Sequence, residues 1–222
     1  MAATDCPQKS KEMPCGRIDG LDKPVSRLAQ GTMMLREDRK EEQFELLDAL
    51  FEMGCNTFDL SHVYGGGMCD RLFGEWVARS GARDRIVILE KGAHHSADRK
   101  RVTPFDIASD LHDSLARLQV DHVDLYVLHR DDPAVPVGPI VEALNEHKAA
   151  GRITLFGGSN WRHERIEAAN EYADKHGLEP FAVSSPNFSL AAQIASPWGD
   201  DCVSISGPDN AAARAWYQER DF

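Results

Sequence analysis

The stretch FDLSHVYGGGMCD, residues 58–70, decides between the two folds that parallel β-sheets commonly adopt. It begins with an apolar segment that ends at Asp59, and three consecutive glycines follow a few residues later. An open, doubly wound sheet that binds a dinucleotide carries the pattern G-x-G-x-x-G in its first strand-to-helix turn. Here the glycines follow the second predicted strand, and Asp70 occupies the place of the third motif glycine. The stretch therefore favours a closed (β/α)8 barrel.

The rest of the chain alternates between strand-like and helix-like segments, which is typical of βαβ units and a parallel sheet. Apolar runs predict six strands, at residues 28–33, 55–59, 86–90, 123–129, 153–157 and 181–185. Helical periodicity predicts helices at residues 39–53, 69–80, 104–118, 138–150, 162–176 and 210–220. Thr103 and Pro104 mark one helix start, because threonine is a favoured N-cap and proline fits the first helical position. We predict an α/β fold of the (β/α)8, or TIM-type, barrel.

The predicted barrel is incomplete, with about six of the eight βα units that closure requires. We expect residues 1–22 to form a flexible tail, because they are polar and mixed in character. Residues 23–222 would form the barrel domain, without its C-terminal βα units. A barrel that lacks two strands leaves sheet edges and part of its core uncovered.

Composition argues against several classes of function. The net charge is −11, which disfavours a nucleic-acid partner because binding phosphates requires a basic face. No run of 18 or more apolar residues is present, so we expect no membrane span. The N-terminus lacks the apolar segment of a secretory signal, and the five cysteines show no metal-finger spacing. Free thiols in a reducing compartment, and hence a cytoplasmic protein, are the simplest interpretation.

Ionisable residues gather at the predicted C-terminal ends of strands, where barrels place their chemistry. Asp59 ends the second strand with Tyr64 in its loop, Lys91 ends the third and His129 ends the fourth. A tyrosine hydroxyl has a pKa of about 10, but a nearby ammonium lowers that pKa. An aspartate would keep the lysine charged, and a histidine can hold a carbonyl oxygen. The set predicts a proton donor that protonates a carbonyl oxygen as hydride reaches the carbon.

These residues resemble the catalytic tetrad of the aldo-keto reductase family. The segments FDLSHVYGGG, IVILEKG, DLYVLHRDD and GGSNW are similar to successive motifs of that family, and the resemblance covers roughly residues 24–222. It implies a (β/α)8 barrel that uses NADP(H) to reduce an aldehyde or ketone to an alcohol, or to catalyse the reverse. It also implies catalytic roles for Asp59, Tyr64, Lys91 and His129.

The resemblance further implies a set of cofactor contacts. Ser159 and Asn160 would contact the nicotinamide carboxamide, Ser185 stands where the family usually has glutamine, and Phe188 would stack on the ring. The strands whose loops hold the cofactor phosphates in the family have no counterpart downstream. We therefore expect weak NADP(H) binding, and possible inactivity, for this chain without a partner.

Several alternatives remain open from the sequence. An aldo-keto reductase-like chain can be a regulatory, cofactor-sensing or inert protein. A metal-dependent hydrolase on the same barrel is less favoured, because the first strand ends in GTMM where such barrels commonly carry an HxH pair. Its candidate ligands would be Asp59, His62, His94, His95 and His129. Ser159 and Asn160 could also serve as the N-cap of the next helix.

Overall fold

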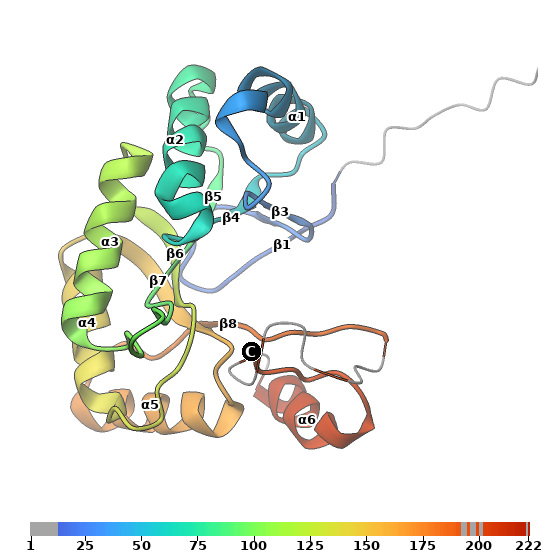
Figure 1. Ribbon diagram of the computed structural model, residues 1–222. Coiled ribbons are helices and arrows are strands. Elements are labelled where there is room, and N and C mark those ends of the chain that lie inside the picture. Colours follow the sequence, from blue (N-terminus) through green and yellow to red (C-terminus); the bar gives the residue numbers. More distant parts are fainter. Residues whose placement is uncertain (1–12, 192–194, 196–198, 200–201, 221) are drawn as a thin grey trace, which may run out of the picture.

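Six parallel strands form one sheet in the order β3-β4-β5-β6-β7-β8, as the computed structural model shows (Figure 1). The structure describes residues 13–191, 195, 199, 202–220 and 222. The strands are β3 (Ala29–Gly31), β4 (Thr57–Asp59), β5 (Val87–Gly92), β6 (Val123–Leu128), β7 (Ile153–Ser159) and β8 (Val183–Ser185). Each predicted strand is therefore confirmed, with the first, second and last shorter than expected.

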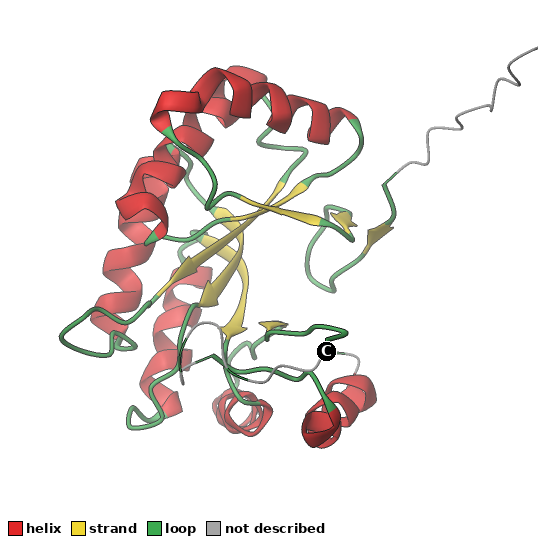
Figure 2. Cartoon of the chain, turned by 45° about the vertical axis from the view of Figure 1, so that its right-hand side comes forward, coloured by secondary structure: helices red, strands yellow, loops and turns green. Residues whose placement is uncertain are grey.

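The predicted helices are also present and cover the outer side of the sheet (Figures 1 and 2). They are α1 (Lys40–Glu52), α2 (Met68–Ser80), α3 (Pro104–Leu118), α4 (Val137–Ala149), α5 (His163–His176) and α6 (Ala211–Arg220). Short 3-10 turns lie at Glu37–Arg39, Tyr64–Gly67 and Pro208–Asn210. The Thr103 hydroxyl accepts a hydrogen bond from the Asp106 amide at 3.3 Å, which confirms the predicted N-cap. No helix in the described ranges has the length and apolar character needed to cross a bilayer.

The sheet curls into an incomplete barrel. Figure 2 shows the strands twisting around a common axis, with helices on the convex side only. Within the described part of the chain, β3 and β8 each pair with a strand of this sheet on one side only. This arrangement confirms the prediction of about six βα units of a (β/α)8 fold.

Most of the core lies between the sheet and its helices. Phe58 of β4 packs against Phe73 and Trp76 of α2, with ring centroids 5.0 and 5.2 Å apart. All three side chains are fully buried. Burying each large side chain contributes about 2–3 kcal/mol, so this cluster fixes α2 on the sheet.

The inner side of the sheet is covered at one end by a hairpin that the sequence did not predict. Strands β1 (Cys15–Gly16) and β2 (Val25–Ser26) pair in antiparallel fashion. The apolar contacts join Ile18, Leu21 and Val25 to Val87, Leu125 and Leu155. The expected flexible tail of residues 1–22 is thus wrong for residues 13–22, which pack on the sheet. Residues 1–12 lie outside the described residues.

Alternation along β5 divides its side chains between the two sides of the sheet. Ile88 and Glu90 face the helices, where Glu90 accepts a hydrogen bond from Ser114 of α3 at 2.9 Å. Val87 and Leu89 belong to the inner cluster, and Lys91 continues that inner row into a pocket. The same alternation places Asp59 and Ser159 on the inner side, at the C-terminal ends of β4 and β7.

Gly157 of β7 permits the close approach of β8. A Cβ added at this position would overlap the main-chain oxygen of Val183. We expect Gly157→Ala to destabilise the fold by roughly 1–3 kcal/mol, the usual cost of overpacking. Urea denaturation followed by circular dichroism measures this change. The control is Gly31→Ala, because a Cβ there would meet nothing within 4 Å. Equal stabilities for the two variants would contradict the packing explanation.

Candidate active site

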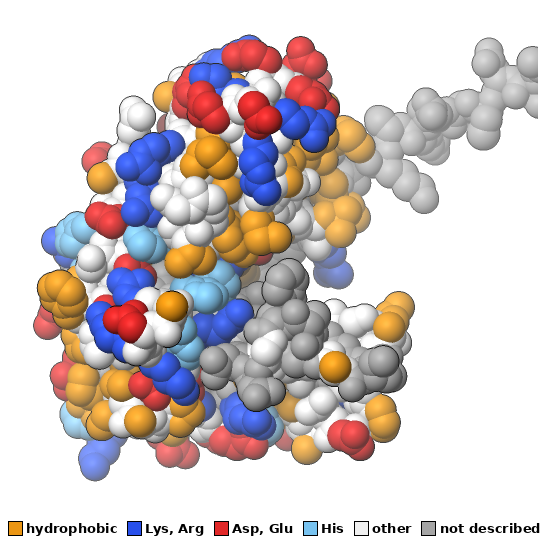
Figure 3. Space-filling view, viewed as in Figure 1, with side chains coloured by type: hydrophobic (Ala, Val, Ile, Leu, Met, Phe, Trp, Pro, Cys, Tyr) orange, Lys and Arg blue, Asp and Glu red, His pale blue; other side chains and the backbone are white. Residues whose placement is uncertain are grey.

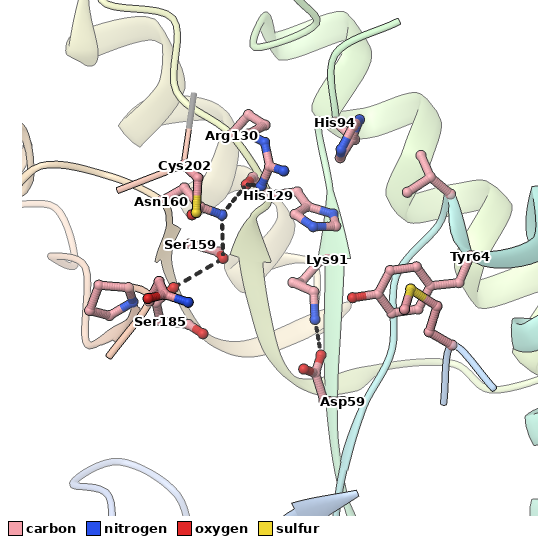
Figure 4. Close-up of a pocket in the computed structure, with 14 residues that line it drawn as sticks. Asp59, Tyr64, Lys91, His94, His129, Arg130, Ser159, Asn160, Ser185 and Cys202 are labelled. Carbon is pink, nitrogen blue, oxygen red and sulfur yellow. Dashed lines mark hydrogen bonds and ion pairs between the residues drawn. The ribbon is translucent and has the colours of Figure 1, made fainter. Parts of the chain in front are cut away.

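A pocket of about 500 Å³ opens at the C-terminal ends of the strands. Figure 3 shows histidine side chains beside lysine and arginine side chains in the hollowed middle of this face. The pocket brings together seven of the eight residues that the sequence selected. They are Asp59, Tyr64, Lys91, His129, Ser159, Asn160 and Ser185 (Figure 4).

An ion pair between Lys91 and Asp59 forms one wall of this pocket. The Lys91 side chain is only 6% exposed, whereas that of Asp59 is 37% exposed. Burial, and then the charge of Arg130, lower the pKa of the Lys91 ammonium to about 7. The Asp59 carboxylate acts in the opposite direction, since an opposite charge favours the ammonium. Near neutral pH, Lys91 is therefore poised to gain or lose a proton.

Tyr64 lies across from this ion pair. The Lys91 Nζ atom is 5.2 Å from the centroid of the Tyr64 ring, and Figure 4 shows the tyrosine hydroxyl directed toward that ammonium. The expectation that lysine lowers the tyrosine pKa is wrong in its net direction. Burial, and then the charge of Glu90, raise the pKa of Tyr64, while Arg130 acts against them. Tyr64 therefore keeps its hydrogen at neutral pH and is suited to donate it.

The three glycines after Tyr64 form a defined turn. Gly65, Gly66 and Gly67 have φ values of 57°, 63° and 87°, which lie in the left-handed region that favours glycine. At Gly67 an added Cβ would also lie 2.6 Å from the Arg117 guanidinium. The glycines thus set the direction in which the chain leaves Tyr64 and enters α2.

His129 is buried beside Tyr64 and held by a serine. Its pKa falls to about 2, because burial and then the charge of Lys91 disfavour the imidazolium. Its Nδ1 atom is 2.9 Å from the Ser61 hydroxyl, which also lies 3.2 Å from the main-chain oxygen of Lys91. The Ser61 hydroxyl has a single hydrogen. If it donates that hydrogen to the Lys91 oxygen, Nδ1 carries the ring hydrogen and Nε2 is an acceptor. If it donates to Nδ1 instead, the ring hydrogen resides on Nε2. The neutral histidine can then donate that hydrogen to a bound molecule.

Ser159 and Asn160 are tied to neighbouring backbone. Asn160 Nδ2 donates to the His129 oxygen at 3.1 Å and to the Ser159 hydroxyl at 3.2 Å. Ser159 in turn donates to the Ser185 oxygen at 3.1 Å. The alternative role as an N-cap is wrong, because α5 has Arg162 at that position, without a side-chain cap bond. Both residues instead shape the pocket wall at the end of β7.

Phe188 is the one selected residue that the structure does not bring to the pocket. Its side chain is 61% exposed and is not among the residues that line the cavity. Pro186 and Asn187 line the wall after Ser185 instead. The predicted stacking of Phe188 on a nicotinamide ring would require this side chain to lie in the pocket wall, where the structure does not place it.

The candidate metal ligands are distributed between two environments. His62 lies outside the pocket, 3.3 Å from Asp113 and 3.7 Å from Asp110 of α3. His94 lines the pocket, with its ring 4.7 Å from that of His129. Among the described residues, no group of three or more His, Cys, Asp or Glu side chains is arranged to hold a metal ion. The geometry does not favour the hydrolase alternative.

A buried pair of carboxyl groups lies behind the pocket, on the helix side of β5. The Ser114 hydroxyl is 2.9 Å from Glu90 and 3.3 Å from Asp70, and both acids are fully buried. Burial, the largest cause, raises the pKa of Asp70 to about 7 and raises that of Glu90 well above its usual value. The pair therefore retains protons at neutral pH, which limits the negative charge next to Tyr64.

Comparison with known proteins identifies the family. The sequence profile described as "Aldo/keto reductase family" matches residues 27–197. The chain belongs to this family. The uncharacterized oxidoreductase YrpG of Bacillus subtilis is 28% identical over 184 residues, which is 77% of this chain and 56% of that protein. Norsolorinic acid reductase stcV of Emericella nidulans is 31% identical over 166 residues, 69% of this chain and 42% of that protein.

Solved structures agree with this family assignment. The aldo-keto reductase AKR11C1 from Bacillus halodurans, in its holo form, matches with a TM-score of 0.64 and 27% identity. The match covers 72% of this chain and 55% of that one. The thermostable aldo-keto reductase Tm1743, in complex with the inhibitor epalrestat, matches with the same TM-score and 26% identity, over 78% and 61% of the two chains. This chain spans about half the length of the curated relatives that it matches.

The sequence analysis did not select several residues at or near the pocket, Val63, Pro186 and Asn187 among them. Ser61 sits two positions after Asp59, Arg130 directly follows His129, and Met33 and Cys202 line the cavity. Arg130 could have been selected, because it follows a strand end by the same rule that selected His129. Ser61 gave no signal, since a single serine in a strand-to-helix turn is most simply a turn residue.

The lowered pKa of Lys91 makes a prediction about stability. Between pH 7 and the usual lysine range, the unfolded chain holds a proton that the folded chain has released. This lysine therefore makes stability rise with pH, by roughly 1 kcal/mol per pH unit at most. Urea denaturation at pH 7 and pH 9 should show that Lys91→Met removes this rise.

The matched control is Lys148→Met, which removes a lysine paired with Glu179 on the surface at 3.2 Å. This control should keep the wild-type difference in stability between the two pH values. If Lys91→Met kept that difference as well, the folded-state pKa of Lys91 would not be lowered.

Proposed function

We propose that this chain is an NADP(H)-dependent oxidoreductase that reduces an aldehyde or ketone to an alcohol, or catalyses the reverse reaction. The observation that carries this proposal is the convergence of Asp59, Tyr64, Lys91 and His129 from the ends of three adjacent strands on one pocket. The family assignment supports it, as do relatives named norsolorinic acid reductase and aryl-alcohol dehydrogenase. The choice of NADP(H) over NAD(H) rests on the family resemblance.

The wall formed by Ser159, Asn160 and Ser185 fits a nicotinamide carboxamide. The Ser159 hydroxyl gives its hydrogen to the Ser185 oxygen, and Asn160 Oδ1 accepts from the Val203 amide at 3.2 Å. Each oxygen keeps capacity to accept a further hydrogen bond, as a carboxamide N–H requires. The Ser185 hydroxyl lines the pocket and can donate to the carboxamide oxygen. Phe188 is not part of this proposed contact.

The proposed chemistry divides among four side chains. Bound nicotinamide supplies hydride to the carbonyl carbon. Tyr64 donates its hydroxyl hydrogen to the carbonyl oxygen, which is general acid catalysis. His129, neutral and carrying its hydrogen on Nε2, holds that oxygen in place. The Lys91–Asp59 pair then stabilises the phenolate that Tyr64 leaves, because the ammonium is an opposite charge nearby.

The raised pKa of Tyr64 favours the reductive direction at neutral pH. A protonated tyrosine is ready to donate, whereas alcohol oxidation requires the phenolate as a base. Burial, the largest cause of the raised pKa of Tyr64, disfavours that phenolate. We therefore propose carbonyl reduction as the main reaction near pH 7, with oxidation gaining as pH rises.

We further propose a small-molecule carbonyl substrate and a cytoplasmic location. Cys15, Cys55, Cys69 and Cys202 are free thiols in the part of the chain that the structure describes. Free thiols persist in reducing compartments. The net charge of −11 supports a partner other than nucleic acid.

Replacing the proposed donor gives a direct test. Tyr64→Phe removes the hydroxyl and keeps the ring, so the turnover number for an aldehyde such as 4-nitrobenzaldehyde should fall roughly a hundredfold or more. Oxidation of NADPH, followed by its absorbance, measures the rate. Tyr172→Phe is the control, since Tyr172 bonds Glu142 on the surface and should leave the rate unchanged. A Tyr64→Phe variant with the wild-type rate would exclude this residue as the donor.

Cofactor binding tests the other wall of the pocket. Fluorescence titration should show that NADPH binds with the low affinity expected of this chain without a partner, and that Ser159→Ala weakens this binding about fivefold, the loss expected for one hydrogen bond. Ser96→Ala is the control, because Ser96 lies in an exposed loop and bonds Asp98. Tighter binding of NADH would contradict the proposed cofactor. Identical dissociation constants for both serine variants would contradict the proposed carboxamide contact.

A further inference from the structure

Arg130 lines the pocket next to His129. Its Nη1 atom donates a hydrogen bond to the main-chain oxygen of His129 at 3.0 Å, and this is its one side-chain hydrogen bond among the described residues. No ion pair joins it to any carboxylate in the ranges that the structure describes. No residue in the described part of the chain takes up its remaining N–H groups, so these can donate to a bound molecule.

The two acids that follow Arg130 are turned toward other partners. Asp131 pairs with Arg165 of α5 at 3.1 Å, and Asp132 lies 3.9 Å from the Lys100 ammonium. In the loop after β6, the carboxylates of Asp131 and Asp132 are thus paired with basic side chains, whereas the Arg130 side chain lines the pocket.

The charge of Arg130 acts on four ionisable groups around the proposed carbonyl position. It disfavours the cationic forms of Lys91, His94 and His129, and it lowers the pKa of Tyr64 against the effect of burial. Figure 4 shows Arg130 above His129, on the same side of the pocket as His94. Arg130, Tyr64 and His129 line one cavity, so a molecule held by Tyr64 and His129 would occupy the same pocket as the guanidinium.

We propose that Arg130 binds an anionic group of the substrate, so that this site prefers small carbonyl compounds that carry a carboxylate or a phosphate near the carbonyl. A guanidinium suits this task because its planar N–H groups can bind two oxyanion oxygens at once. The inference rests on the proposed function, since it assumes that the carbonyl lies between Tyr64 and His129.

The phosphates of a nicotinamide dinucleotide offer the same chemistry, but their position is less favourable. The ring sits against Ser159 and Ser185 in the proposed arrangement, and a ribose separates it from the first phosphate. Arg130 adjoins His129, which holds the carbonyl oxygen in the proposed arrangement, and it shares the His129 main-chain oxygen with Asn160 of the carboxamide wall. A substrate anion a few bonds from the carbonyl reaches Arg130 more directly.

The test compares an acid with its neutral ester. The probes are 4-carboxybenzaldehyde and methyl 4-formylbenzoate, which share the aldehyde and differ in charge. Dissociation constants are measured by calorimetry with NADP⁺ present, which cannot donate hydride, and kcat/KM is measured with NADPH. Wild-type protein should prefer the acid, and Arg130→Gln should reduce that preference about ten- to a hundredfold, the range of a hydrogen-bonded charge pair.

Two further variants serve as controls for the effect of Arg130→Gln. Arg130→Lys keeps the positive charge but lacks the planar pair of N–H donors, so it should retain part of the preference for the acid. Partial retention would also show that the protein tolerates substitution at this position. Arg162→Gln removes an exposed arginine at the start of α5, at the same end of the barrel, and should retain all of it.

The outcomes separate this inference from the proposed function. An acid preference in binding that Arg130→Gln abolishes, without reduction of either aldehyde, supports the anion site and contradicts the oxidoreductase proposal. Reduction of both aldehydes with an unchanged ratio in Arg130→Gln overturns the anion site alone. If Arg130→Gln instead weakens NADP⁺ binding and leaves the ratio unchanged, the arginine serves the cofactor phosphate and the inference is wrong. Binding of neither aldehyde also overturns it.

Discussion

The ion pair between Lys91 and Asp59 joins the ends of β5 and β4, and the arrangement of the pocket depends on it. Taking a lysine ammonium out of water costs several kcal/mol unless a carboxylate meets it. Lys91 is 6% exposed, so it needs Asp59 as its neighbour. The parallel register pairs Asp59 with Leu89, and Lys91 lies two residues further along the same face. A one-residue shift of either strand would turn one partner toward the helices.

Strand β5 buries a base on one face and an acid on the other, and the protonation states of both affect Tyr64. Lys91 is a buried base on the inner side, while Glu90 is a buried acid on the helix side. Burial favours the neutral form of each, so the pKa of the lysine falls and that of the glutamate rises. Asp70 and Glu90 therefore add less negative charge beside the tyrosine than two free carboxylates would. When Lys91 carries its proton and Glu90 is protonated, Tyr64 between them can lose its hydrogen at moderate cost.

Sequence reasoning located the strand ends well, because the signals involved are local. Helix caps such as Thr103 and the apolar runs depend on neighbouring residues, and parallel strands bring their C-terminal ends to one edge. The hairpin of Cys15–Gly16 with Val25–Ser26 was missed because two-residue strands carry no periodicity. The direction of the Tyr64 pKa was misjudged because burial is a tertiary property. Phe188 was misplaced because the chain after β8 is irregular, so motif spacing does not fix a side-chain direction.

The loop after β6 shows how a negatively charged protein can present a positive pocket. Surface charges separated from the pocket by more than about 8–10 Å are largely screened at physiological ionic strength. The net charge of −11 therefore has little influence on a molecule bound inside this cavity. The side chains of Arg130 and Lys91 line the cavity and act on such a molecule directly. Asp131 does not cancel this local charge, because its carboxylate is taken up by Arg165. The nearest side chains, and not the average composition, decide which small molecules this pocket can hold.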